Sequence, residues 1–323
     1  MRKPKVFITR KWPASVEATL TALYDVTLNE TDRPLTADEF KTALQEYDAV
    51  CPTVCDTFPA DVINVTNKRC KILGNFGVGY NHIDINAAKQ QGIIVTNTPG
   101  VLTESTADIA MTLLLMSARR GAEGDRIVRA QQWHGWCPTH MLSTDVTGAT
   151  LGLIGFGRIA QAMARKAHHG FGMHILYYNP SPANADTVAN LNAVRCDSVD
   201  EVISRADFVS LHCPGGAETK HLINAARLNL MKPSAHLINT ARGDVVDSQA
   251  LIDALRNKQI AGAGLDVYEN EPDIHADFLK LDNVTLLPHL GSATLNTRTA
   301  MGEKVLANLA AFFNGKEPMD RIV

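Results

Sequence analysis

The chain of 323 residues is 45% hydrophobic and 20% charged, a globular composition long enough for about two domains. Its 31 Lys and Arg against 34 Asp and Glu give a formal net charge of −3, which does not favour a nucleic-acid partner. The longest apolar run, residues 109–116, is far shorter than the roughly 20 residues of a membrane span, and the start does not resemble a secretory signal, so we expect a cytoplasmic protein without a membrane partner.

Short strand-like runs alternate with helical segments over the first hundred residues. We expect strands at 6–9, 48–51, 71–74 and 93–96. The capping-box pattern Thr36-Ala-Asp-Glu39 predicts a helix start, and a second helix, Ile85–Gln91, ends at Gly92. Such alternation predicts a parallel sheet with helices on its faces.

The pattern changes at Thr103 to one long helix, for which Ser105–Asp108 is a plausible cap. A polar loop with tryptophans follows from Gln131 to Gly148. Strand–helix alternation then resumes, with strands expected at 150–154, 175–178, 208–211, 236–239, 262–266 and 284–287. Helices are expected at 158–168, from Ser198, at 248–257 after Asp247, and at 295–313 before Asn314-Gly315. The chain is therefore expected to form two α/β units.

The six cysteines lack both a Cys-x-x-Cys pair and a Cys/His set at zinc spacing; they are residues 51, 55, 70, 137, 196 and 213. This usage is typical of a cytosolic protein with reduced, mostly buried thiols. We expect no metal site.

A glycine-rich turn, Gly152–Ala160, lies between a predicted strand and a predicted helix. In the G-x-G-x-x-G/A fingerprint of dinucleotide sites, the first glycine makes the tight turn and the second lets the backbone approach a pyrophosphate. The helix N-terminus then presents free N–H groups to the phosphates. We expect this turn to bind a dinucleotide. The residues expected to contact it are Gly155, Phe156, Gly157, Arg158 and Ile159.

Asn179 closes the next strand, about twenty residues past the turn, where the fingerprint has an acid that contacts the adenosine ribose. An acid there binds the ribose hydroxyls and repels a 2′-phosphate, whereas neutral Asn179 repels neither. No arginine follows within six residues to bind a phosphate. NAD(H) is modestly favoured, and NADP(H) stays open.

Three polar residues, Arg242, Glu271 and His289, follow predicted strands of the second unit, where α/β sheets bind ligands. Reduction of a carbonyl by hydride needs a proton donor, a positive group that holds the substrate, and a partner that keeps the donor protonated. Imidazolium, guanidinium and carboxylate meet these needs. Taken singly, each residue is also compatible with a structural role.

Four stretches together resemble the D-isomer-specific 2-hydroxyacid dehydrogenase family over essentially the whole chain: Gly152–Ala160, Asn239–Asp247, Gly264–Pro272 and Pro288–Ser292. The resemblance implies that Arg242 binds the substrate carboxylate and carbonyl, that His289 is the general acid/base, and that Glu271 orients His289. It also implies cofactor contacts at Thr106, Cys213, Thr240, Asp266 and Gly291.

The family resemblance further implies two Rossmann/flavodoxin-like, doubly wound parallel-sheet domains with an active-site cleft between them. Residues 1–99 and 290–323 would bind the substrate, and residues 100–289 would form the NAD(P)-binding domain. The loop Gly74–Asp84 is similar to the family loop whose backbone N–H groups hold the substrate carboxylate, and Val78 and Gly79 are the residues assigned to that role.

Within the family, Ser117–Asp125 and Trp133–Pro138 are most similar to glyoxylate/hydroxypyruvate reductases, also called glycerate dehydrogenases. In those enzymes the second tryptophan, here Trp136, reaches across a homodimer into the partner's site; an equally weighted alternative is that it anchors its own loop at the interface. The implied function is NAD(P)H-dependent reduction of a small 2-oxo acid to the D-2-hydroxy acid. A 2-ketoaldonate (2-ketogluconate) reductase is the alternative enzyme, phosphite dehydrogenase is a more distant one, and an NAD-sensing corepressor-like protein is the alternative without catalysis.

Overall fold

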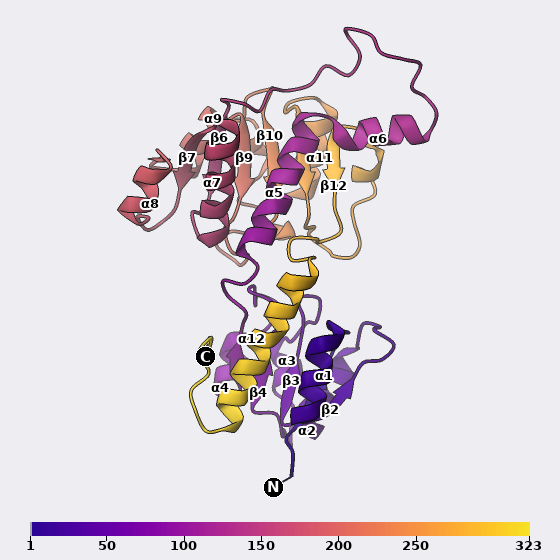
Figure 1. Cartoon of the computed structure of the whole chain (residues 1–323), viewed down its shortest axis with the longest axis vertical. Helices are drawn as coiled ribbons and strands as arrows, with labels where there is room; N and C mark the ends of the chain where they lie inside the picture. The colour runs from indigo at the N-terminus through magenta and orange to yellow at the C-terminus, as the bar shows by residue number, and fades with distance from the viewer. Residues whose placement is uncertain (1) are drawn as a thin grey trace. The chain divides into compact units, whose positions relative to one another are not determined.

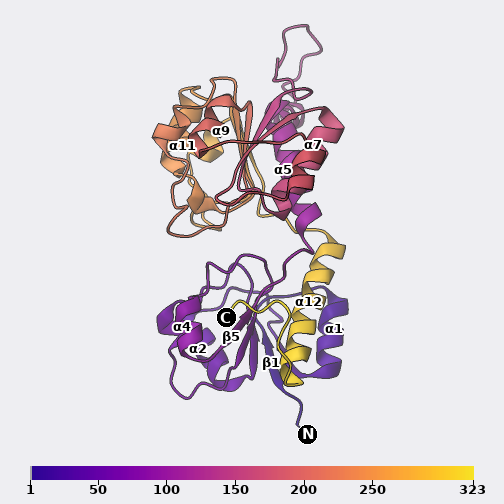
Figure 2. The same cartoon turned by 90° about the vertical axis from the view of Figure 1, so that its left-hand side faces the viewer.

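The computed structural model describes residues 2–323, which form two compact units. Unit 1 comprises the chain up to Leu102 together with Ala293–Val323, and unit 2 comprises Thr103–Ser292. Each unit is a parallel sheet with helices on both faces (Figures 1 and 2). The expected fold class, two doubly wound α/β domains, is confirmed.

Unit 1 contains a five-stranded parallel sheet in the order β2-β1-β3-β4-β5. Its strands are β1 (Lys5–Ile8), β2 (Asp25–Leu28), β3 (Ala49–Cys51), β4 (Ile72–Gly74) and β5 (Ile94–Thr96). The helices α1 (Ala14–Leu23) and α12 (Leu295–Phe313) cover one face, and α2 (Ala37–Glu46), α3 (Ala60–Ile63) and α4 (Ile85–Gln90) cover the other (Figure 2). The last helix of the chain therefore completes the core of the first unit, through Val305 and Leu309.

Unit 2 contains a seven-stranded parallel sheet in the order β12-β11-β10-β9-β6-β7-β8. Its strands are β6 (Thr150–Ile154), β7 (His174–Tyr178), β8 (Val194–Arg195), β9 (Phe208–Leu211), β10 (His236–Asn239), β11 (Gly262–Leu265) and β12 (Val284–Leu286). The chain runs outward from β6 first to one side and then to the other. The order reverses between β6 and β9, the place where such sheets bind ligands at their carboxyl ends.

Helices cover both faces of this second sheet. One face carries α5 (Thr103–Ala118), α7 (Arg158–Phe171) and α8 (Ala185–Asn190), and the other carries α9 (Val199–Arg205), α10 (Ala225–Leu228) and α11 (Ser248–Arg256) (Figure 2). Unit 2 also contains two 3-10 turns, Gly243–Val245 and Phe278–Lys280. The two apolar faces of the sheet give unit 2 two separate cores.

The expected strands lie within one residue of those observed, and the caps at Thr36, Ser198 and Asp247 accept hydrogen bonds from the first turns of their helices. The single long helix from Thr103 is wrong. It ends at Ala118, Arg120 takes a left-handed φ of 51°, and a new helix α6 (Gly121–Arg129) begins. Because α5 starts at Thr103, Ser105–Asp108 lie inside the helix rather than capping it.

None of the six cysteines, all within residues 2–323, is in a disulfide, but only half of them are buried, so the expectation of mostly buried thiols holds in part. Cys55 and Cys137 are exposed. Along residues 2–323, none of the helices combines the length and the apolar character that a bilayer crossing needs. In the same range, no group of three His, Cys, Asp or Glu side chains is placed to hold a metal ion.

Tight packing of β6 against α9 requires a glycine at position 152. A Cβ there would lie 2.6 Å from Val202 Cγ1 and 2.8 Å from Ala206 Cβ. Gly152→Ala should therefore lower the free energy of unfolding by roughly 1–3 kcal/mol, measured by urea denaturation. Gly170→Ala, the same change inside α7 where a Cβ meets nothing within 4 Å, is the control and should not destabilise. Equal effects of the two changes would contradict this packing account.

Candidate active site

The turn between β6 and α7 is built around a glycine that no other residue can replace. Gly155 has a φ of 84°, and a Cβ there would lie 2.8 Å from the carbonyl carbon of His212. Its N–H donates to the carbonyl oxygen of Tyr178 over 2.9 Å. The turn at the end of β6 is therefore held against the ends of both neighbouring strands.

Gly157 is a glycine for a different reason. Its φ of −76° suits any residue, and a Cβ there would meet nothing within 4 Å. The protein's own packing therefore leaves open space at the N-terminus of α7. The N–H groups of Arg158 and Ile159 lie in the first turn of this helix, so no carbonyl oxygen of the helix accepts them. Open space, free donors and the positive end of a helix dipole together fit the pyrophosphate of a dinucleotide.

Asn179, at the end of β7, is tied into the same turn. Its side-chain oxygen accepts the N–H of Phe156 over 3.1 Å, and its side-chain nitrogen donates to the carbonyl oxygen of Ser181 over 2.9 Å. The Phe156 ring is buried and stacks on Tyr177, so only the backbone of Phe156 faces the turn. Asn179 therefore positions the glycine turn and leaves no carboxylate at the end of β7.

Arg195, which belongs to none of the sequence motifs, also lies at the end of β7. Its Nη2 donates to the carbonyl oxygens of Asn179 and Pro180 over 3.3 and 3.5 Å. The sequence gives little indication of this position, because β8 has only two residues, both exposed, and was not predicted as a strand. An arginine sixteen positions away in sequence thus reaches the end of β7.

Arg242, Glu271 and His289 follow the carboxyl ends of three neighbouring strands, β10, β11 and β12. Asp266 follows β11 and is 1% exposed. Its carboxylate accepts the N–H groups of Leu290 and Gly291 over 2.6 and 2.8 Å, and its carbonyl oxygen accepts that of His289 over 3.0 Å. These bonds hold the turn after β12, in which His289 takes a φ of 54°. Burial raises the pKa of Asp266, against the lowering effect of the two N–H groups and of His289.

His289 and Glu271 form a hydrogen-bonded pair. His289 Nδ1 lies 2.7 Å from Glu271 Oε2, and Glu271 Oε1 accepts the N–H of Tyr268 over 2.9 Å. Burial raises the pKa of Glu271, but the bonds from His289 and Tyr268 and the charge of Arg242 outweigh it, so the net pKa is below the ordinary value. The carboxylate is therefore ionised at neutral pH, while Nε2 of His289 makes no hydrogen bond within the described chain.

Arg242 follows β10 and is held close to this pair by two glycines. A Cβ on Gly243 would lie 1.8 Å from the carbonyl carbon of Tyr268, and one on Gly215 would lie 2.9 Å from Arg242 Cγ. Burial lowers the pKa of Arg242, while the charges of Glu271 and Asp244 act in the opposite direction. The guanidinium stays charged at neutral pH, so imidazole, carboxylate and guanidinium converge in unit 2.

The remaining residues assigned to the cofactor also lie in unit 2. They differ in whether their polar groups already have a hydrogen-bond partner. The Thr106 hydroxyl already donates to the carbonyl oxygen of Gly291 over 3.0 Å. The Thr240 hydroxyl is buried and lacks a partner among residues 2–323, the kind of group that a bound ligand satisfies. Cys213 is half-buried, and burial raises the pKa of its thiol to about 11, so it is not a reactive thiolate at neutral pH.

In unit 1, the loop after β4 presents backbone donors. Asn75 donates to the carbonyl oxygens of Gly77 and Gly79, each over 3.0 Å, and Asn97 donates to that of Val78 over 2.8 Å. These bonds hold the loop through its carbonyl groups. The N–H groups of Val78 and Gly79 have no hydrogen-bond partner in the described chain. Two free, adjacent N–H groups are suited to an anion.

Trp136 lies in the loop between α6 and β6. Its side chain is 83% exposed, and Trp133 in the same loop is 55% exposed. The loop extends away from the sheet of unit 2 (Figure 1). Within the described chain, the Trp136 side chain is therefore not packed into the core of unit 2.

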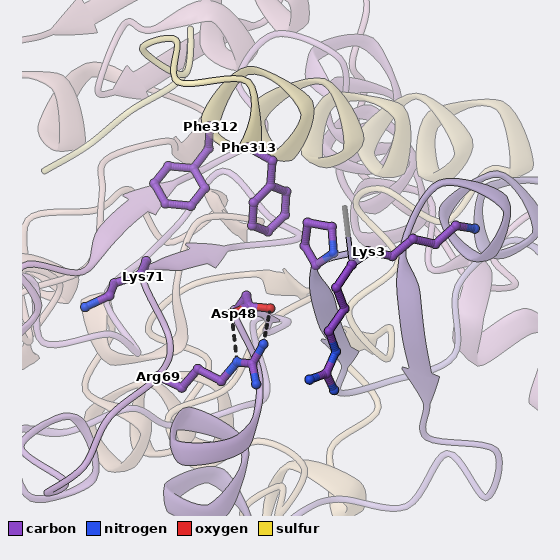
Figure 3. Close-up of a pocket in the computed structure, with 8 residues that line it drawn as sticks. Lys3, Asp48, Arg69, Lys71, Phe312 and Phe313 are labelled. Atoms are coloured by element: carbon purple, nitrogen blue, oxygen red, sulfur yellow. Dashed lines mark hydrogen bonds and ion pairs between the residues drawn. The ribbon is translucent and has the colours of Figure 1, made fainter.

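A hollow of 280 Å³ lies near the amino ends of strands in the unit 1 sheet (Figure 3). Asp48 and Lys71, which precede β3 and β4, line it together with Phe312 and Phe313 of α12. Arg69 crosses it to form an ion pair with Asp48 over 2.7 Å. Because doubly wound sheets bind ligands at the carboxyl ends of their strands, we do not assign this hollow to the active site.

Comparisons with known proteins find relatives that cover almost the whole chain. Residues 111–291 match the family model described as D-isomer specific 2-hydroxyacid dehydrogenase, NAD binding domain. The chain is 45% identical over 320 residues to the glyoxylate reductase of Thermococcus onnurineus, covering 98% of this chain and 95% of that one.

Two solved structures are similar over almost the whole chain. An NADPH-dependent glyoxylate/hydroxypyruvate reductase from Sinorhizobium meliloti, solved with NADP and malonate, has a TM-score of 0.88 and 34% identity over 99% of this chain and 97% of that one. A glyoxylate reductase from Paecilomyes thermophila has a TM-score of 0.87 and 29% identity, covering 100% of this chain and 99% of that one.

The open space at Gly157 gives a direct test of the dinucleotide site. Gly157→Ala adds a Cβ that meets no protein atom within 4 Å, so the melting temperature should stay close to that of the wild type. The same Cβ would occupy the path of the pyrophosphate, so the affinity for NADH and NADPH, measured by fluorescence titration, should fall about tenfold. Unchanged affinity for both would remove the glycine turn from the site.

Proposed function

Because this chain belongs to the D-isomer-specific 2-hydroxyacid dehydrogenase family, we propose that it reduces glyoxylate and hydroxypyruvate to the corresponding 2-hydroxy acids. The chain is an oxidoreductase with an NAD binding domain. Relatives named glyoxylate reductase, at up to 45% identity over almost the full length, support the substrate class. The observation that carries the proposal is the His289–Glu271 pair beside Arg242, at the same sheet edge as the glycine turn.

We assign cofactor binding to unit 2 and substrate binding to unit 1. A bound nicotinamide dinucleotide supplies the hydride for C2 of the 2-oxo acid. Its pyrophosphate would be held by the turn Gly155–Ile159 and its adenosine ribose would lie near Asn179. The other proposed cofactor contacts are Thr106, Cys213, Thr240, Asp266 and Gly291.

The chain's own residues then manage the proton and the charge of the substrate. Nε2 of His289 donates a proton to the carbonyl oxygen as the carbonyl is reduced, and Glu271 stabilises the imidazolium before transfer. Arg242 holds the carboxylate and polarises the carbonyl, and the N–H groups of Val78 and Gly79 bind the carboxylate. Neutral imidazole remains after the step and must be reprotonated before the next turnover.

Two further expectations concern the assembly and the location of the chain. The exposed Trp136 fits a loop that packs against a second copy of the chain, but the homodimer stays a prediction. Six cysteines without a disulfide in the described chain fit the cytoplasmic location that we propose.

The substrate assignment is tested by measuring kcat/KM for glyoxylate, hydroxypyruvate, pyruvate and 2-ketogluconate, each with NADH and with NADPH. We expect the highest values with glyoxylate or hydroxypyruvate. A clear preference for 2-ketogluconate would show that the chain is a 2-ketoaldonate reductase instead. Absence of turnover in every combination would contradict the reductase function.

The roles of His289 and Arg242 predict large losses of activity in their variants. His289→Ala should lower kcat by about 10²- to 10⁴-fold, the usual contribution of a general acid, and Arg242→Ala should lower kcat/KM by about 10²-fold or more. Both should still bind NADH, as measured by fluorescence titration.

His221→Ala is the matched control for His289. His221 is also hydrogen-bonded to a glutamate of unit 2, with Nε2 lying 2.6 Å from Glu269 Oε1, but it has no assigned role. The control should keep most of the activity. If the His289 or Arg242 variant turned over at a near-normal rate, the assignment would be wrong.

The Glu271–His289 pair also predicts a change in pH dependence. Reduction requires protonated His289, and the ionised Glu271 stabilises that form. In Glu271→Gln the neutral amide removes this stabilisation, so kcat/KM for glyoxylate should be lower than in the wild type. The pKa of the Glu271 carboxylate lies below its ordinary value, so the wild-type kcat/KM should fall on the acid side as that carboxylate is protonated, and the variant should lack this fall. The profile is measured from about pH 3 to 9. Glu269→Gln, which changes the pairing of His221 instead, should leave the profile in place, and an unchanged profile in Glu271→Gln would count against the pairing.

A further inference from the structure

We propose that Arg195 binds the 2′-phosphate of NADP(H) and makes NADP(H) the preferred coenzyme of this chain. The inference deepens the proposed function, on which it rests, by naming the residue that distinguishes the two dinucleotides. It departs from the preference for NAD(H) drawn from the sequence, which considered only the six residues after Asn179.

The sheet topology brings Arg195 to the adenosine end of the dinucleotide site. β8 is the edge strand beside β7, and Arg195 is paired in register with Tyr177, two positions before Asn179. Because both strands run in the same direction, the side chain reaches forward to the carboxyl end of β7. There its Nη2 bonds the carbonyl oxygens of Asn179 and Pro180.

The guanidinium is fixed in place but not neutralised. Its two partners are backbone carbonyls, and no carboxylate lies within ion-pair distance in the part of the chain that is described. Of its three nitrogens only Nη2 is engaged, so the donors on Nε and Nη1 are available. An anchored arginine with free donors and an exposed side chain suits a phosphate.

The neighbouring groups favour a phosphate over a bare ribose hydroxyl. Dinucleotide sites selective for NAD place an acid at the end of this strand, which binds the 2′-hydroxyl and repels a phosphate. Here that residue is Asn179, whose amide is committed to Phe156 and Ser181. The Ser181 hydroxyl accepts from Asn179 over 3.2 Å, which leaves its own O–H free to donate to a phosphate oxygen.

The test is direct binding, which does not depend on turnover. The dissociation constants of NADP⁺, NAD⁺ and the fragment 2′,5′-ADP are measured by calorimetry for the full chain and for Arg195→Ala. The wild type should bind NADP⁺ more tightly than NAD⁺. Arg195→Ala should weaken NADP⁺ and 2′,5′-ADP about tenfold, the loss of one charge-assisted contact, and should leave NAD⁺ unchanged.

Two further variants separate recognition from a structural role. Arg195→Gln keeps an N–H donor for the carbonyl of Asn179 but removes the charge, so it should weaken NADP⁺ selectively even if Arg195→Ala is unstable. Arg256→Ala removes the same charge from the end of α11, where Arg256 pairs with Asp253 and Asp277, and should change neither affinity.

The proposal is overturned if the wild type binds NAD⁺ as tightly as NADP⁺, or if Arg195→Gln weakens both coenzymes alike, as a merely structural arginine would. Its failure is distinguishable from failure of the proposed function. A chain that reduces glyoxylate but shows no selective effect at Arg195 refutes only this inference. A chain that binds NADP⁺ through Arg195 and reduces no 2-oxo acid refutes only the proposed reaction.

Discussion

The candidate active site depends on the hydrogen bonds made by the buried carboxylate of Asp266. Burial of a carboxylate is unfavourable, and here it is offset by the N–H groups of Leu290 and Gly291. Those bonds, with the one from the His289 N–H to the carbonyl oxygen of Asp266, join the loop after β11 to the loop after β12. His289 can therefore hold a left-handed backbone conformation in which its ring meets Glu271. Without this connection, the two members of the pair would lie on independent loops.

Parallel strands explain why residues far apart in the chain converge. β10, β11 and β12 are neighbours that all run in the same direction, so the residues that follow them meet at one edge of the sheet. Gly243 then allows the loop after β10 to approach the backbone of Tyr268 at a distance that any side chain would prevent. The resulting site combines a charged guanidinium, an ionised carboxylate and an imidazole with one free nitrogen. That combination is suited to holding a carboxylate while a proton is given to a carbonyl oxygen.

Sequence reasoning predicted the elements with strong local signals and missed those without them. Buried strands such as Thr150–Ile154 and Phe208–Leu211 agree in both bounds because each is a buried run of mainly apolar residues. The two-residue strand β8 has no such run, and its pairing with β7 is a tertiary contact that brings Arg195 to Asn179. The break at Arg120 depends on a left-handed residue, and no glycine or asparagine at that position indicated it. The strand-end positions of Arg242, Glu271 and His289 were predictable, whereas the hydrogen bonds that orient them were not, since they depend on loop conformation. Their catalytic roles stay predictions.

We infer that Glu271 and His289 act as one unit in proton transfer. A double-mutant cycle on the single-turnover rate of glyoxylate reduction tests it most directly, by comparing Glu271→Gln, His289→Asn and the double variant with the wild type. The double variant should be no slower than His289→Asn alone, since Glu271 acts only through the imidazole. Losses that multiply independently would contradict it.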